Sequence, residues 1–420
     1  MMDHVLSLKS LISGREFAPD EVMYVDPAYG NEGILDVQYD YDLIKSRFSR
    51  EQLAANQDFT IWRYKPLLPV APDAAVPPLA VGWTPLYDAP RMADYLGLQQ
   101  VWVKDDGRNP TASFKDRASA IAVVKAQELN ADVVTTASTG NAAAALSGLC
   151  ASVQQRNVIF VPESAPQAKV AQLLVFGSTV LLVRGTYDDA FELCLQAADE
   201  YGWYNRNTGY NPYMSEGKKT ASFEICEQLG WQAPDAIFVS VGDGCIIGGL
   251  HKGLKDLVAM GWIDHMPRLI GVQSEGSDYM HQAWVNDEDV LTKPAIEAHT
   301  VADSISAGLP RDRMKAMAAV KETDGAYVSV SDEAILNAIP AMARLSGVFG
   351  EPAGATAYAG LMKAVRDGLV SATDRVVVLN TGNGLKDIAS AMTAVDQIGT
   401  VAHRVSPDLE DVKRVVQTLE

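Results

Sequence analysis

Short apolar runs alternate with helical segments through the middle of the chain. The apolar runs occupy residues 133–137, 158–161 and 180–183, and the helical segments occupy residues 118–129, 142–153, 169–176 and 188–201. Short apolar strands separated by helices are typical of a parallel sheet with helices on its faces. The alternation predicts a small α/β domain over residues 119–205.

A second series of the same kind follows, and it predicts a large domain made of residues 81–118 and 206–420. Its expected strands are residues 236–241, 269–273, 327–330 and 376–379, and its expected helices are residues 246–258 and two segments on either side of Glu351. The predicted fold is therefore α/β, with two doubly wound open-sheet lobes and a cleft between them at the carboxyl ends of the strands. Residues 1–80 show no strong periodicity, and prolines between 66 and 78 predict an N-terminal extension ending in a linker.

Composition narrows the class of protein. The chain has 420 residues with 35 basic and 53 acidic side chains, a net charge of -18 that disfavours nucleic acids and anionic membranes as partners. No apolar run approaches the ~18 residues of a membrane span, and the N-terminus lacks the apolar core of a signal peptide. The four cysteines form no C-x-x-C pair and the six histidines have no ligand spacing. We therefore expect a cytoplasmic protein without a metal site.

Three polar loops follow three of the predicted strands. They are "STGN" at residues 138–141, "VGDGCIIGG" at residues 241–249 and "TGNGLKD" at residues 381–387. Free backbone N–H groups at a following helix can bind a carboxylate or phosphate, and glycines let the backbone approach it closely. The second loop lacks the Gly-Lys-Ser/Thr ending of a nucleotide-binding loop and is not a dinucleotide fingerprint. Each loop alone is equally compatible with an ordinary capped turn.

The segment "NPTASFKDRAS" at residues 109–119 contains a lysine that could serve as a reactive amine. Such a lysine must lose its proton near neutral pH, which requires desolvation or a nearby positive charge. Phe114 and Ala118 could form an apolar wall around Lys115. The alternative is that Lys115, Asp116 and Arg117 simply form a charged first helical turn.

Taken in this order, the four segments resemble fold-type II pyridoxal-phosphate (PLP) enzymes, and specifically the threonine synthase family. Further similar segments, between about residues 60 and 395, are "VGWTPLY", "NPYMSEGKKTASFEI", "ADSISAGLPR" and "FGEPAGATAYAGL". The resemblance implies a homodimeric PLP enzyme acting on a small amino acid. The implied reaction converts O-phospho-L-homoserine and water to L-threonine and phosphate, through deprotonation at the α- and β-carbons, loss of phosphate from the γ-carbon and water addition at the β-carbon.

The resemblance also implies a role for each site residue. Lys115 would attach the cofactor and carry protons, Asn141 would hydrogen-bond the 3-oxygen of PLP, and Thr381 would face its pyridine nitrogen. The backbone N–H groups that would hold the cofactor phosphate belong to Gly242, Asp243, Gly244, Cys245 and Ile246. The residues expected near the substrate carboxylate are Ser138, Thr139 and Gly140. Glu351, held before a proline, is expected to close the cofactor pocket.

Two positions depart from the family pattern. Ala142 and Met214 stand where the family usually carries a threonine and an arginine that help to bind the phosphate of the substrate. Another cation could take the place of the missing arginine. The candidates are Lys104, which we assign to substrate binding, and Lys218 or Lys219. The departures favour an alternative function, β-elimination or β-replacement on serine, threonine or O-phosphoserine. A PLP-binding protein without turnover is a third reading, which loss of function on replacing Lys115 would exclude.

Overall fold

A computed structural model describes residues 2–138, 140–165 and 167–418, and its largest sheet has six strands. These are β4 (Leu86–Asp88), β5 (Gln100–Asp105), β10 (Ala236–Ser240), β11 (Arg268–Ser274), β12 (Ala326–Val330) and β13 (Arg375–Asn380). Their spatial order is β12-β11-β10-β13-β5-β4, and every pair is parallel except the edge pair β4 and β5. The four strands expected after residue 206 are confirmed.

Both faces of this sheet are covered by helices, which explains why its strands read as continuous apolar runs. Along β10, Ile237 and Val239 belong to a cluster that includes α10 (Cys245–Met260) and α12 (Arg313–Glu322). Ala236 and Phe238 point the other way, into a cluster with α13 (Asp332–Ser346) and α14 (Pro352–Arg366). Successive side chains of a strand alternate between faces, so a strand buried on both sides must be apolar at nearly every position.

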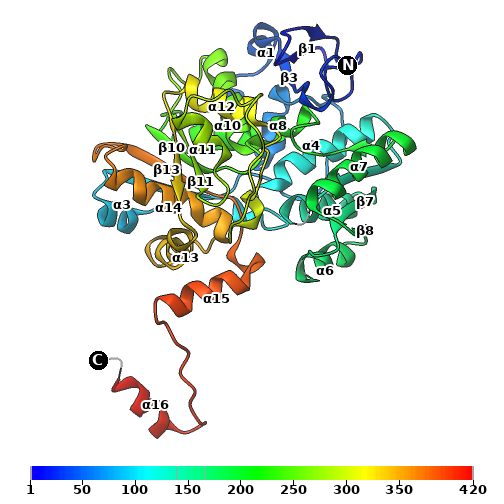
Figure 1. The fold of residues 1–420 in the computed structure, drawn as a ribbon. Helices are drawn as coiled ribbons and strands as arrows, with labels where there is room; N and C mark the ends of the chain where they lie inside the picture. The colour runs from blue at the N-terminus through cyan, green and yellow to red at the C-terminus, as the bar shows by residue number, and fades with distance from the viewer. Residues whose placement is uncertain (1, 139, 166, 419–420) are drawn as a thin grey trace.

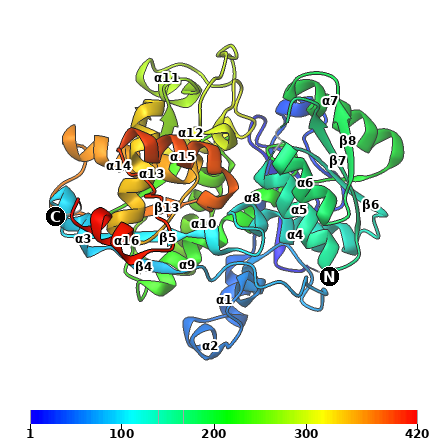
Figure 2. The same ribbon diagram turned by 90° about the horizontal axis from the view of Figure 1, so that it is seen from below.

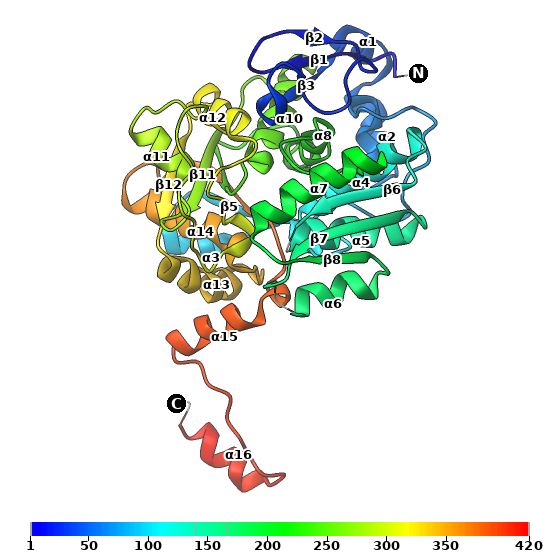
Figure 3. The same cartoon turned by 45° about the vertical axis from the view of Figure 1, so that its right-hand side comes forward.

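A second sheet, of four parallel strands, lies in the other half of the molecule (Figure 2). Its order is β8 (Thr179–Val183), β7 (Arg156–Pro162), β6 (Val133–Ala137) and β9 (Tyr204–Asn205). Helix α7 (Tyr187–Tyr201) covers one face, whereas α4 (Lys115–Glu128) and α5 (Asn141–Ser152) pack on the other, with α6 (Gln167–Val175) beside α5 (Figure 3). The predicted two-lobed α/β fold is confirmed. The domain boundaries stay a prediction, because α4 packs against both α5 and α8 (Tyr213–Lys218).

The N-terminal extension differs from the prediction. It forms an antiparallel sheet, ordered β2 (Glu16–Phe17), β1 (Val5–Ser10) and β3 (Leu35–Tyr39), followed by α1 (Tyr41–Arg47) and α2 (Arg50–Ala55). The segment expected to be a linker is instead packed: Tyr64, Leu67 and Leu68 are fully buried. The prolines fit this segment because it is a short 3-10 helix (Ile61–Leu67) and an irregular stretch whose apolar side chains face the core.

At the other end, the chain leaves the body of the molecule. Helix α15 (Ile388–Gln397) still packs against α13 and buries Ala394 there, whereas Figures 1 and 3 show α16 (Leu409–Val416), which has no buried residue, extending away from the body. Over the described ranges, no helix has the length and apolar character needed to cross a membrane.

A buried ion network anchors the start of α4. Arg117 donates to Asp106 at 2.6 Å and to Glu224 at 2.8 Å, and all three side chains are fully buried. Lys115, Asp116 and Arg117 do form the charged first turn of α4, but the turn is buried, since Asp116 also has no exposed surface and accepts from Thr111. The network fixes the helix turn that carries Lys115.

Candidate active site

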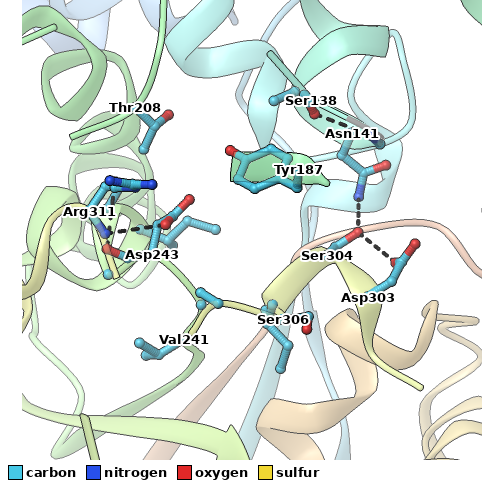
Figure 4. A pocket seen from close by; sticks show the side chains of 18 of the residues that line it. Ser138, Asn141, Tyr187, Thr208, Val241, Asp243, Asp303, Ser304, Ser306 and Arg311 are labelled. Carbon is cyan, nitrogen blue, oxygen red and sulfur yellow. Dashed lines mark hydrogen bonds between the residues drawn. The ribbon is translucent and has the colours of Figure 1, made fainter. Parts of the chain in front are cut away.

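A cavity of about 500 Å³ opens between the two sheets. It is walled by the loop after β6, the loop after β10, the residues after β9 and a segment between residues 296 and 311. Figure 4 shows Asn141 beside Ser304 on one side and Asp243 beside Arg311 on the other, with Tyr187 projecting between them. The volume lies within the range of small-ligand sites, and the position at the carboxyl ends of parallel strands is where such folds bind ligands.

The glycine-rich loop after β10 has the geometry of a phosphate cradle. Helix α10 begins at Cys245, and its N-cap Gly244 has φ 88°, a conformation that favours glycine. A Cβ on Gly242 would lie 2.8 Å from the Cα of Ile305, so only glycine fits there without displacing the backbone. No side chain caps α10, which leaves its first N–H groups to face the cavity. The predicted residues Gly242, Asp243, Gly244, Cys245 and Ile246 all line it.

Lys115 lines the same cavity, at the first turn of α4. The pKa of Lys115 is lowered to about 8, first by burial and then by the positive charges of Lys218 and Arg206, while Glu351 acts in the opposite direction. The nearby positive charges are therefore these two cavity residues rather than the adjacent Arg117, whose charge is compensated by carboxylates. This environment raises the neutral fraction of the amine near physiological pH, as a reactive lysine requires.

Asn141 and Glu351 meet across the cleft between the two domains. The Nδ2 of Asn141 donates to Oε1 of Glu351 at 2.6 Å, and to Oγ of Ser304 at 3.5 Å. Glu351 is the N-cap residue of α14, and burial raises the pKa of its carboxyl group. Asn141 lines the cavity, so its amide is available for exchange from Glu351 to a bound ligand.

Two of the three residues predicted near the substrate carboxylate, Ser138 and Gly140, line the cavity. The Oγ of Ser138 accepts from the backbone N–H of Gly140 at 3.2 Å, which shapes the turn into α5. Thr139 lies outside the described residues. The contact of this loop with a substrate stays a prediction.

Other predicted residues lie away from the cavity. Lys104 is fully buried on β5, its Nζ donates to Glu224 and to the carbonyl of Thr84, each at 2.7 Å, and it does not line the cavity; its contact with a substrate stays a prediction. Lys219 is paired with Glu216 and Asp256. Thr381 is buried with its carbonyl accepting from the N–H of Phe114, and it does not line the cavity; its contact with the pyridine nitrogen stays a prediction.

The structure adds three cavity residues that the sequence patterns did not identify: Tyr187, Arg206 and Arg311. Tyr187 comes soon after β8, the strand expected at residues 180–183, so a search for polar residues beyond every expected strand would have found it, but the same search would have missed Arg206. The strand before Arg206 is β9, which has only two residues and leaves no periodicity to recognise.

Comparison with known proteins agrees with this geometry. The family model described as "Pyridoxal-phosphate dependent enzyme" matches residues 78–382. The threonine synthase of Methanocaldococcus jannaschii is 35% identical over 97% of this chain and 98% of its own length. That of Methanosarcina acetivorans is 39% identical over 90% of this chain and 92% of its own length.

Solved structures support the fold. The processed form of threonine deaminase isoform 2 from Solanum lycopersicum has a TM-score of 0.65 at 20% identity, covering 92% of this chain and 99% of that protein. Diaminopropionate ammonia lyase from Escherichia coli has a TM-score of 0.64 at 19% identity, over 84% and 94% of the two chains. Likeness at this level of identity establishes a shared architecture.

Proposed function

The chain belongs to the threonine synthase family of pyridoxal-phosphate-dependent enzymes, and on this premise we propose that it converts O-phospho-L-homoserine and water to L-threonine and phosphate. The observation that carries the proposal is that relatives bearing this activity in their names match 97% and 90% of the chain. Support from the chain itself comes from an amine of lowered pKa in a cavity that also contains a glycine-rich helix N-terminus.

The residues present fit the cofactor. When bound, pyridoxal phosphate withdraws electrons from the α-carbon of an amino acid and so makes its protons removable. The first N–H groups of α10 would hold the cofactor phosphate. Gly242 has no side chain to shield these groups, and its close contact with Ile305 leaves no room for one. With the cofactor bound, the amide of Asn141 would donate its hydrogen bond to the ring hydroxyl oxygen instead of to Glu351.

Lys115 would hold the cofactor and then move protons at the α- and β-carbons of the substrate. Its lowered pKa suits this role, because a base works best when its pKa is near the working pH. Ser138 and Gly140 would bind the substrate carboxylate at the start of α5, where free N–H groups favour an anion.

The enzyme acts on a small amino-acid substrate. We further propose that it is a cytoplasmic homodimer that binds neither nucleic acid nor membrane. The four cysteines support a reducing compartment, since all are buried free thiols. The net charge of -18 supports the absence of polyanion binding. Sedimentation of the purified protein tests the dimer.

The test of the activity is to give PLP-loaded enzyme O-phospho-L-homoserine and to quantify threonine and phosphate together. Equal amounts of both are expected, and Lys115→Ala should form neither. Consumption of O-phosphoserine, serine or threonine without threonine formation from O-phosphohomoserine would instead support the elimination or replacement chemistry. A normal cofactor spectrum with no turnover of any of these substrates would indicate a binding protein.

A further inference from the structure

Arg206 is a buried cation without an anionic partner. The side chain and backbone of Arg206 together are 1% exposed. Its Nε donates to Oγ of Ser119 at 3.2 Å, and its Nη2 is buried with no hydrogen-bond partner among the described residues. No carboxylate in the described part of the chain lies within 4.0 Å of its guanidinium group. Arg117, equally buried, is paired with two carboxylates. An uncompensated buried charge is unfavourable, so the difference between unpaired Arg206 and paired Arg117 points to an anionic ligand for Arg206.

Lys218 is a second cation of the same kind. It is fully buried at the end of α8 and lines the same cavity as Arg206, and its Nζ contacts only Oγ1 of Thr208, at 3.5 Å, among the hydrogen bonds of the described residues. Burial and the charge of Arg206 lower its pKa, while the more distant carboxylates of Asp312 and Asp243 act in the opposite direction. Burial likewise lowers the pKa of Arg206, to about 10. An anion bound between the two would favour both charged forms.

The packing of α8 explains why Lys218 reaches the cavity. A Cβ on Gly217 would clash with the backbone carbonyl of Arg117, so glycine lets α8 lie directly against the first turn of α4, where Lys115 lies. Met214, on the preceding turn of α8, is 1% exposed in the hydrophobic core and does not line the cavity. An arginine at position 214 is therefore not required for a cation to face the cavity.

Building on the proposed function, we propose that Arg206 and Lys218 together bind the phosphate group of the substrate. The cofactor phosphate has its own donors in the uncapped N-terminus of α10. Arg206 follows β9 on the small-sheet side of the cavity, and Lys218 ends α8, which packs against both α4 and α10. A phosphate monoester carries close to two negative charges at neutral pH, which two cations match. The arginine fork can make two parallel hydrogen bonds to it, and the lysine adds a point charge.

The inference predicts selectivity for phosphorylated amino acids. Serine and threonine carry no group that would pair with the two cations, so binding them would leave both charges buried and uncompensated. O-phosphohomoserine and O-phosphoserine would each supply the anion. The chain length of the substrate must then be distinguished by other walls of the cavity.

The test is calorimetric titration of the PLP-loaded holoenzyme with inorganic phosphate. Arg206→Gln should weaken phosphate binding by roughly 10- to 100-fold, the loss expected for charge-assisted hydrogen bonds, and Arg206→Lys should recover part of it. Lys218→Gln tests the same site should Arg206→Gln not accumulate as folded protein. The matched control is Arg156→Gln, on strand β7 of the same sheet, whose side chain is 71% exposed. It should bind phosphate as the wild type does.

Several results would overturn the inference. Wild-type holoenzyme that binds no phosphate, or both variants binding it as the wild type does, would exclude the site. Variants that lose affinity for PLP but keep phosphate binding in the loaded fraction would assign the cations to the cofactor instead.

Turnover separates this inference from the proposed function. If O-phosphohomoserine is converted and Arg206→Gln leaves its KM unchanged, the inference fails and the function stands. If the wild type binds phosphate through Arg206 and Lys218 but does not form threonine, the function fails and the site stands.

Discussion

The amine of Lys115 should react as a neutral nucleophile at a lower pH than an ordinary lysine. Its pKa is lowered from 10.5 to about 8 by burial first and by the charge of Lys218 second. At pH 7 a pKa of about 8 leaves roughly one molecule in ten neutral, whereas a pKa of 10.5 leaves about one in 3000. The neutral fraction in the folded protein is therefore about 300-fold larger.

Acetylation of the cofactor-free protein over a range of pH, read by peptide mass spectrometry, measures this pKa directly. The labelling rate of Lys115, normalised to a free amine added as a standard, should reach half its maximum near pH 8. Lys218→Met removes a positive charge and should move the midpoint upward, whereas Lys9→Met, an exposed residue of the N-terminal extension, should not move it. A midpoint near 10.5, or no change in Lys218→Met, would refute the reasoning.

The same shift makes stability depend on pH. Between about pH 8 and pH 10.5 the unfolded chain still binds a proton that folded Lys115 has lost, so the free energy of unfolding of the cofactor-free protein rises with pH across that window. The rise is at most about 3 kcal/mol. Lys115→Met removes the group and should flatten it in urea denaturation curves recorded at both ends of the window. An equal rise in the variant would mean that another group titrates there.

Two further predictions concern the frame of the site. Glu224→Gln should lower the free energy of unfolding by about 3–5 kcal/mol, because it leaves the buried charge of Arg117 partly uncompensated. The control Asp132→Asn removes one partner of an exposed ion pair and should lower it by less than about 1 kcal/mol. Similar losses for the two variants in urea denaturation would contradict this account. Gly242→Ala should weaken PLP binding about tenfold or more, since the methyl group of the alanine would lie 2.8 Å from the Cα of Ile305. If equilibrium dialysis shows unchanged affinity for PLP, the proposed phosphate cradle is excluded.

The sequence predicted the strands best where burial is most complete. The strand expected at residues 133–137 is β6 to the residue; helices cover both faces of its sheet and all five side chains are buried, the two threonines with their hydroxyl groups hydrogen-bonded. Strand β9 has two residues, and the sheet of the N-terminal extension has short strands with mixed patterns, so neither left a periodic signal. The prolines near residue 66 predicted a linker because composition does not report whether the neighbouring side chains are buried.

By itself the sequence also determined most of the candidate site, since its loops directly follow apolar strands and parallel strands bring such loops to one edge. Lys115, Asn141 and the loop at residues 242–246 meet there as expected. Which cations join them was decided only by tertiary structure. Neighbouring residues of a helix point about 100° apart, so Lys218 faces the cavity while Lys219 turns to the carboxylates of Glu216 and Asp256. Nothing in two adjacent lysines says which one packing will leave without a partner.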